Sequence, residues 1–184
     1  VFAGDMIRGP GQEEQEKADL MLRFFSTMNY QAVAPGEMDL SLGASFWKER
    51  ARRFPFLVCA NVYDAQEGKP LFIPWLLKKI RLPSGPTIKV AATGVLAAEL
   101  WPPAGVAPEM QTGLAVRDHV EALRGLVPQM RRQADLIVVL AHVGDAKARG
   151  LAEAVPDIDV IVAGHTAGAA ILQPASVGAS LVVS

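Results

Sequence analysis

The chain has 184 residues, of which 51% are hydrophobic and 20% are charged, and its formal net charge is −1. This length and apolar content are typical of one folded domain with a sizeable core, and they exclude a disordered chain. A nucleic-acid interface is not expected, because no block of lysine and arginine stands out beyond residues 48–53, which we assign to the solvated face of a helix. No run of residues is long and apolar enough to span a membrane.

Short apolar runs alternate with amphipathic stretches along the chain, and this alternation predicts an α/β layered fold. Helices are predicted over residues 12–29, 44–53, 118–132 and 145–154. The apolar face of the first helix is expected to comprise Leu20, Leu22, Phe24, Phe25 and Met28. Strands are predicted over residues 1–4, 30–34, 56–60, 71–82, 87–96, 136–141, 159–163 and 181–183. The sequence Ser84-Gly85-Pro86 has turn chemistry and is expected to join the two longest strands.

Both ends of the chain lie inside predicted strands. The sequence opens with Val1 partway into one strand and stops at Ser184 without a closing turn. We therefore expect residues 1–184 to be a domain truncated at both ends and part of a longer polypeptide. Cys59 is the only cysteine and lies in an apolar run, so we expect a core residue rather than a nucleophile.

Chemically active side chains recur where apolar runs end. Two of the three histidines, His142 and His165, each follow a short β-branched run, and Asp5 follows the first apolar run of the chain. Ligands of α/β sheets collect at the carboxyl ends of the strands, and imidazole and carboxylate groups are common metal ligands. These three residues therefore predict a divalent-metal site. In the alternative interpretation they only cap loops, and the third histidine, His119, is assigned to a helix as a surface or packing residue.

The order of these motifs resembles that of the calcineurin-like metallophosphoesterases, and within them the 5′-nucleotidase branch. Gly4-Asp5-Met6-Ile7-Arg8-Gly9 matches the Gly-Asp-x-x-x-Gly step of the family. Residues 30–43 lie over the segment that carries the Gly-Asn-His-Glu motif, and residues 54–63 resemble the strand that follows it. Residues 134–144 and 157–166 resemble the last two metal-binding strands. The resemblance covers nearly the whole chain and implies an α-β-β-α sandwich with mixed sheets.

The resemblance also implies a set of metal ligands. Four residues of this chain occupy the ligand positions of the family's second metal: Asp5, Glu37, His142 and His165. Glu37 replaces an asparagine and keeps an oxygen ligand, and the set suits Zn, Mn or Fe. One ion rather than two is expected, because Ala167 replaces a histidine ligand of the first metal. The family's opening Asp-x-His strand, which supplies that metal's other ligands, would lie before Val1.

Met38 stands where the family has its catalytic histidine, and a thioether cannot donate a proton. We therefore assign no catalytic residue. The resemblance implies a divergent metal-dependent phosphoester hydrolase with weakened activity. The alternative is a catalytically inactive domain that binds or scaffolds within a larger exported protein. In a third interpretation the histidines are structural and bind no metal.

The resemblance implies a small phosphoester or a nucleotide as the substrate, a periplasmic or extracellular location, and further domains in the same polypeptide. Trp101 lies in a proline-rich loop, Leu100-Trp101-Pro102-Pro103. Its ring either stacks on a nucleotide base or, as is more usual beside two prolines, anchors the loop.

Overall fold

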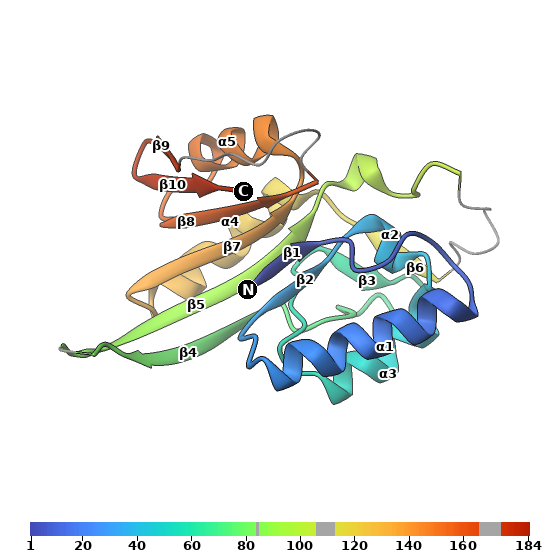
Figure 1. Cartoon of the computed structure of the whole chain (residues 1–184). Helices are drawn as coiled ribbons and strands as arrows, with labels where there is room; N and C mark the ends of the chain where they lie inside the picture. The colour runs from blue at the N-terminus through green and yellow to red at the C-terminus, as the bar shows by residue number, and fades with distance from the viewer. Residues whose placement is uncertain (84, 106–112, 166–173) are drawn as a thin grey trace.

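The computed structural model describes residues 1–83, 85–105, 113–165 and 174–184. Its elements form four layers, in which two β-sheets pack face to face and helices cover the outer side of each (Figure 1). The predicted α-β-β-α sandwich with mixed sheets is confirmed.

The large sheet has six strands in the order β4-β5-β7-β8-β10-β9. Their bounds are Trp75–Arg81 (β4), Thr87–Leu96 (β5), Leu136–His142 (β7), Val160–Gly164 (β8), Ala175–Val177 (β9) and Ser180–Val183 (β10). The four central strands run parallel, whereas β4 and β9 lie antiparallel at the edges. The parallel strands therefore end along one edge of the sheet, where His142 of β7 is paired with Gly164 of β8.

The second layer is a parallel pair formed by β1, Phe2–Gly4, and β2, Val33–Pro35. This pair packs against β5, β7 and β8. Small side chains dominate the buried contact between the two sheets, and they allow the backbones to approach closely: Ala32, Ala34, Val58, Ala92 and Leu140. A further antiparallel pair, β3 (Val62–Asp64) and β6 (Leu114–Val116), continues this layer.

Helices cover both outer sides. The outer face of the large sheet carries α4, His119–Arg131, and α5, Asp145–Ala154. The opposite side carries α1, Gln12–Thr27, and α3, Gly43–Arg53 (Figure 1). Two short elements, α2 (Glu37–Leu40) and the 3₁₀ turn η1 (Ala98–Leu100), follow strand ends. No helix among the described residues has the length and apolarity needed to cross a membrane.

The buried face of α1 is narrower than expected. Ala18, Leu22 and Phe25 pack inward at the i, i+4 and i+7 spacing of a single helical stripe. The expected members Leu20, Phe24 and Met28 are exposed. The prediction was wrong for these three because α1 contacts the rest of the protein along one side only.

Residues 56–60 do not form the predicted strand. Leu57 makes an isolated parallel bridge with Val33, and Val58 makes another with Ile73. Successive residues of this segment thus pair with different neighbours, and no ladder develops. Cys59 is buried, as predicted, and burial raises the pKa of its thiol to about 12. The strands β3, β6 and β9 and the helix α2 were not predicted because three or four residues are too few to show periodicity.

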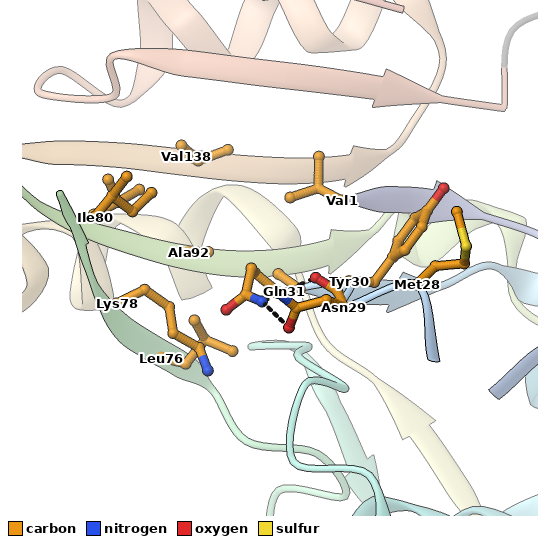
Figure 2. A pocket seen from close by; sticks show the side chains of 12 residues that line it. Val1, Met28, Asn29, Tyr30, Gln31, Leu76, Lys78, Ile80, Ala92 and Val138 are labelled. Atoms are coloured by element: carbon orange, nitrogen blue, oxygen red, sulfur yellow. Dashed lines mark hydrogen bonds between the residues drawn. The ribbon is translucent and has the colours of Figure 1, made fainter. Parts of the chain in front are cut away.

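An apolar pocket of about 450 Å³ lies beside Val1, at the amino-terminal end of β1 (Figure 2). Apolar side chains from β4, β5 and β7 form its floor, whereas residues 28–32 form its rim. On the rim, the Gln31 amide donates hydrogen bonds to the backbone and side-chain oxygens of Asn29, at 2.9 and 2.7 Å. The pocket lies at the opposite end of the strands from His142.

Candidate metal centre

Four ionisable side chains meet where the parallel strands end. His142 is the last residue of β7, and His165 follows the last residue of β8. Asp5 follows β1, and Glu37 is the first residue of α2, which Gly36 separates from the end of β2. Because the β1–β2 pair packs on β7 and β8 with its carboxyl ends pointing the same way, all four side chains lie at one edge.

The four side chains are close enough to bind one ion. Each offers one nitrogen or oxygen atom, and these four atoms lie within 4.8 Å of one another. The His142 Nε2 atom lies 2.6 Å from Glu37 Oε2 and 3.5 Å from Asp5 Oδ2. The His165 Nδ1 atom lies 3.2 Å from Glu37 Oε1. The structure thus brings together all four residues that the sequence singled out, and their role as metal ligands remains a prediction.

Several polar atoms of this cluster are buried without a hydrogen-bond partner among the described residues. They are Glu37 Oε2 and both ring nitrogens of His142. Although His142 Nε2 and Glu37 Oε2 are 2.6 Å apart, their geometry is not that of a hydrogen bond. A buried polar atom without a partner costs about 1–3 kcal/mol. A divalent cation coordinated by Glu37 Oε2 and His142 Nε2 removes that cost for two of these three atoms, so the donor set fits a metal.

The charges of the cluster are coupled. Burial acts to lower the pKa of His142, but the facing carboxylates of Asp5 and Glu37 outweigh it and raise the pKa to about 9. Burial acts to raise the pKa of Glu37, but the His142 imidazole outweighs it and holds that pKa below its usual value. His142 is therefore protonated at neutral pH when no metal is bound, and a metal ion must displace this proton.

Two glycines allow the strands to come this close. A Cβ atom on Gly36 would lie 2.0 Å from Asp5 Oδ1, and one on Gly164 would lie 2.1 Å from the Ala3 carbonyl oxygen. Real Cβ atoms do not approach other atoms so closely. Any side chain at either position would therefore push Asp5 or β1 away from the cluster.

Asp39 is buried beneath the cluster, and our sequence analysis did not identify it. Its Oδ1 atom accepts hydrogen bonds from the backbone N–H groups of Met6 and Ile7, at 2.8 and 3.2 Å, and its Oδ2 atom accepts one from Gly36 at 2.9 Å. Burial raises the pKa of this carboxyl well above its usual range, against the effect of these donors. Asp39 thus joins the loop after Asp5 to the start of α2. An acid three residues after the N-cap Gly36 is half of a capping-box pattern, which is the signal that could have indicated it.

Met38 lines a cavity of about 380 Å³ together with two members of the cluster, Glu37 and His165. Its backbone N–H donates a hydrogen bond to Asp5 Oδ1 at 3.0 Å, which orients that carboxylate. The cavity is lined by one methionine, two acids, one histidine and four apolar residues: Glu37, Met38, Glu99, Leu100, Pro102, Pro103, Ala104 and His165. The candidate metal site therefore opens directly into a space of ligand size.

The remaining expectations for this region have different outcomes. Trp101 does not line the cavity and packs against the core beneath α1 and α3, as expected for a loop anchor. His119 is buried on α4, apart from the cluster, as expected for a packing residue. Ala167 lies outside the described residues, so the loss of its ligand position remains a prediction.

Comparison with known proteins identifies relatives over most of the chain, although no family model matches it. The chain is 28% identical over 88% of its length to a 2′,3′-cyclic-nucleotide 2′-phosphodiesterase/3′-nucleotidase of Salmonella typhimurium. It is 32% identical over 61% of its length to a metallophosphoesterase of Bacillus subtilis, YunD, and 28% identical over 90% to a 5′-nucleotidase of Vibrio cholerae. The chain spans only 27%, 22% and 32% of the lengths of these three proteins.

Solved structures share the fold. A sulfate thiohydrolase of Thermus thermophilus, SoxB, superimposes with a TM-score of 0.79 at 22% identity, covering 98% of this chain and 32% of that one. A 5′-nucleotidase precursor of Thermus thermophilus superimposes with a TM-score of 0.66 at 24% identity, covering 81% of this chain and 28% of that one. These similarities establish the fold, and they are too distant to transfer an activity.

Proposed function

The chain belongs to the calcineurin-like metallophosphoesterases of the 5′-nucleotidase branch, and from this premise we propose that it is a divergent metal-dependent phosphoester hydrolase with one metal site and weakened activity. The observation that carries the proposal is the cluster at the strand ends. Its four ligand atoms lie within 4.8 Å of one another, and three of the cluster's buried polar atoms have no hydrogen-bond partner among the described residues.

The proposed ligands are Asp5, Glu37, His142 and His165. This mixture of oxygen and nitrogen donors suits Zn, Mn or Fe. A divalent ion held there would lower the pKa of a water molecule and polarise a phosphoryl oxygen. One ion is proposed because Ala167 stands where the family has a histidine ligand of the first metal.

The residues of the chain itself prepare this chemistry. The Met38 N–H engages Asp5 Oδ1 and leaves Asp5 Oδ2 directed toward His142. Glu37 is buried between the two imidazoles and contacts both. Asp39 fixes the loop and the helix that carry these carboxylates. The protein therefore supplies a preorganised ligand set beside the cavity, in which Glu37 and His142 are buried.

Weakened activity follows from Met38. A positioned general acid contributes typically about 10²–10⁴-fold to a rate, and the thioether at this position cannot act as one. We propose a small phosphoester, including nucleotides, as the substrate, because the names of two relatives include a nucleotidase activity. A periplasmic or extracellular location is proposed from the family resemblance alone.

The test measures bound metal and phosphate release together. Elemental analysis of the purified protein should find one divalent ion per chain, and the metal-loaded protein should release phosphate from an activated ester slowly. His165→Gln should lower both values, whereas His119→Gln is the matched control for metal content because it removes a histidine outside the cluster. A protein that binds no metal would contradict the proposal. A metal-loaded protein that hydrolyses no ester would favour the alternative, an inactive binding or scaffolding module.

A further inference from the structure

The cavity beside the metal cluster has one polar wall and one apolar wall. Glu37 and His165 form the polar wall and belong to the cluster. The rest of the described lining, here called the apolar wall, consists of Met38, Leu100 and the segment Pro102-Pro103-Ala104, together with one acid, Glu99. A phosphoryl group directed to the cluster would therefore place its leaving group against apolar side chains.

Among the described residues, none on the apolar wall can protonate a departing oxygen. Glu99 is the only ionisable residue lining the cavity outside the cluster, among the residues that the structure describes. It forms an ion pair with Lys147, whose hydrogen bond and charge hold the pKa of Glu99 below its usual value. Glu99 is thus an anion at neutral pH and has no proton to give, and the Met38 thioether has none either.

We propose that this site is selective for phosphomonoesters with an apolar leaving group that departs as a stable anion, that is, for aryl rather than alkyl phosphates. This inference rests on the proposed function and narrows its substrate class, because a nucleotide has a polar alkyl leaving group and would be a poor substrate of this site. The reaction forms a bond between a water oxygen and phosphorus and breaks the bond between phosphorus and the leaving oxygen. The electron pair of the broken bond stays on the leaving oxygen as a phenolate, and both water protons stay on the product dihydrogen phosphate, one of which passes to solvent.

The decisive comparison uses phenyl phosphate and cyclohexyl phosphate. The two leaving groups are similar in size and apolarity, but phenol, like the tyrosine side chain with a pKa of about 10, is far more acidic than an aliphatic alcohol. Metal-loaded wild-type protein should hydrolyse phenyl phosphate with a much higher kcat and a similar KM. Within a series of substituted phenyl phosphates, kcat should rise steeply as the phenol becomes more acidic.

A binding measurement tests the apolar wall without turnover. Phenylphosphonate has a phosphorus–carbon bond in place of the ester linkage and is therefore not hydrolysed. Calorimetry should show that it binds metal-loaded protein more tightly than methylphosphonate does. Equal affinities would mean that the apolar wall does not contact the leaving group, and would overturn that part of the inference.

Met38→His tests the missing proton donor. An imidazole at this position should raise kcat for cyclohexyl phosphate, by up to the roughly 10²–10⁴-fold that a general acid supplies, and should change kcat for the most acidic phenol much less. Met28→His is the matched control, because Met28 is exposed just after the end of α1 and does not line this cavity.

The outcomes separate the two proposals. If wild-type protein hydrolyses cyclohexyl phosphate as fast as phenyl phosphate, the proposed selectivity is wrong, but the proposed hydrolase function stands. If metal-loaded protein hydrolyses neither ester, the proposed function itself falls. Should Met38→His fail to fold, the slope of the phenyl phosphate series on wild-type protein still decides the inference, because a flat series overturns it.

Discussion

The strands that pack between the two sheets carry apolar side chains at one end and ionisable side chains at the other. On β7, Val138 lines the apolar pocket, Leu140 is fully buried, and His142 reaches the metal cluster. The segment around β1 repeats the contrast over five residues, with Val1 at the pocket (Figure 2) and Asp5 at the cluster. The apolar part of each strand holds the two sheets together, and the chemistry is confined to the residues where the strands end.

The charges of the two ends differ as well. Two carboxylates and two imidazoles form the cluster, whereas the ionisable side chains lining the apolar pocket are Lys78 and Tyr30. A lysine ammonium and a phenol do not attract a divalent cation. Metal binding is therefore expected only at the carboxyl ends of the strands, although a cavity lies at each end.

The largest effect is expected from substitutions on β7. His142→Ala removes a ligand, and it should weaken metal binding by more than the roughly 10–100-fold that loss of an outer partner costs. Val138→Ala, four residues earlier on the same face, should keep the metal affinity and lower the free energy of unfolding by about 1 kcal/mol. Calorimetric titration and urea denaturation measure both quantities. Equal loss of metal affinity in the two variants would contradict the assignment of metal binding to the carboxyl end of β7.

A smaller effect is expected where the strand ends must approach closely. Gly36→Ala places a Cβ atom against the Asp5 carboxylate. We expect it to lower stability by about 1–3 kcal/mol through overpacking, and to weaken metal binding because Asp5 moves. Gly150→Ala on α5 is the control, since its Cβ atom would meet nothing within 4 Å. That variant should gain about 0.5–1 kcal/mol, and if Gly36→Ala behaves in the same way, the close approach is not required.

Asp39→Asn changes the hydrogen bonds that hold the backbone beneath the cluster and leaves the four proposed ligands in place. One acceptor oxygen becomes an NH₂ group, so some of the N–H groups of Met6, Ile7 and Gly36 lose their partner. Metal affinity should fall by about 10–100-fold, as for other outer partners. Asp64→Asn is a matched control because Asp64 is also buried and accepts two backbone N–H groups away from the site. If metal titration shows unchanged affinity for Asp39→Asn, Asp39 is structural only.

The smallest effect is expected from an ion pair between α1 and α3, which lies outside both the metal cluster and the apolar pocket. Arg50 donates two hydrogen bonds to Asp19, at 3.0 and 2.8 Å, and holds the pKa of Asp19 below its usual value. A lowered pKa stabilises the fold above the unfolded value of about 4, and this stability is lost as the pH falls through the lower folded value. Because the pair is partly exposed, the contribution should stay below about 1 kcal/mol.

Urea denaturation of wild type and Asp19→Asn at about pH 7 and about pH 3 measures this contribution. The difference in stability between the two proteins should shrink at the lower pH, and metal affinity at neutral pH should not change. A variant that lost metal would show that the α1–α3 side is coupled to the cluster.

Much of the fold could be predicted from local pattern. The helices α3, α4 and α5 and the strands β4, β5, β7 and β8 match their predicted ranges to within a few residues. Each is long enough to show helical or apolar periodicity. Residues 56–60 show the limit, because an apolar run predicts burial and does not reveal whether one neighbour or several will supply the backbone partners.

The candidate site was predictable to a different degree for each residue. Asp5, His142 and His165 stand at the ends of apolar runs, where the sequence itself indicates a site. Glu37 was identified only through the family resemblance, because α2 is too short to show a pattern. Asp39 was missed, because the hydrogen bonds that define its role reach residues 32 and 33 positions away along the chain.

The sequence by itself determined the order of strands and helices, the confinement of polar chemistry to strand ends, and the absence of a proton donor at Met38. These features depend on residue identity and on spacing within one segment. Only the tertiary structure decided that β1 and β2 pack on β7 and β8 closely enough to bring four side chains within 4.8 Å. That distance depends on small residues at the contact between the sheets, on Gly36 and on Gly164, and contacts of this kind form between segments whose mutual positions no local pattern specifies.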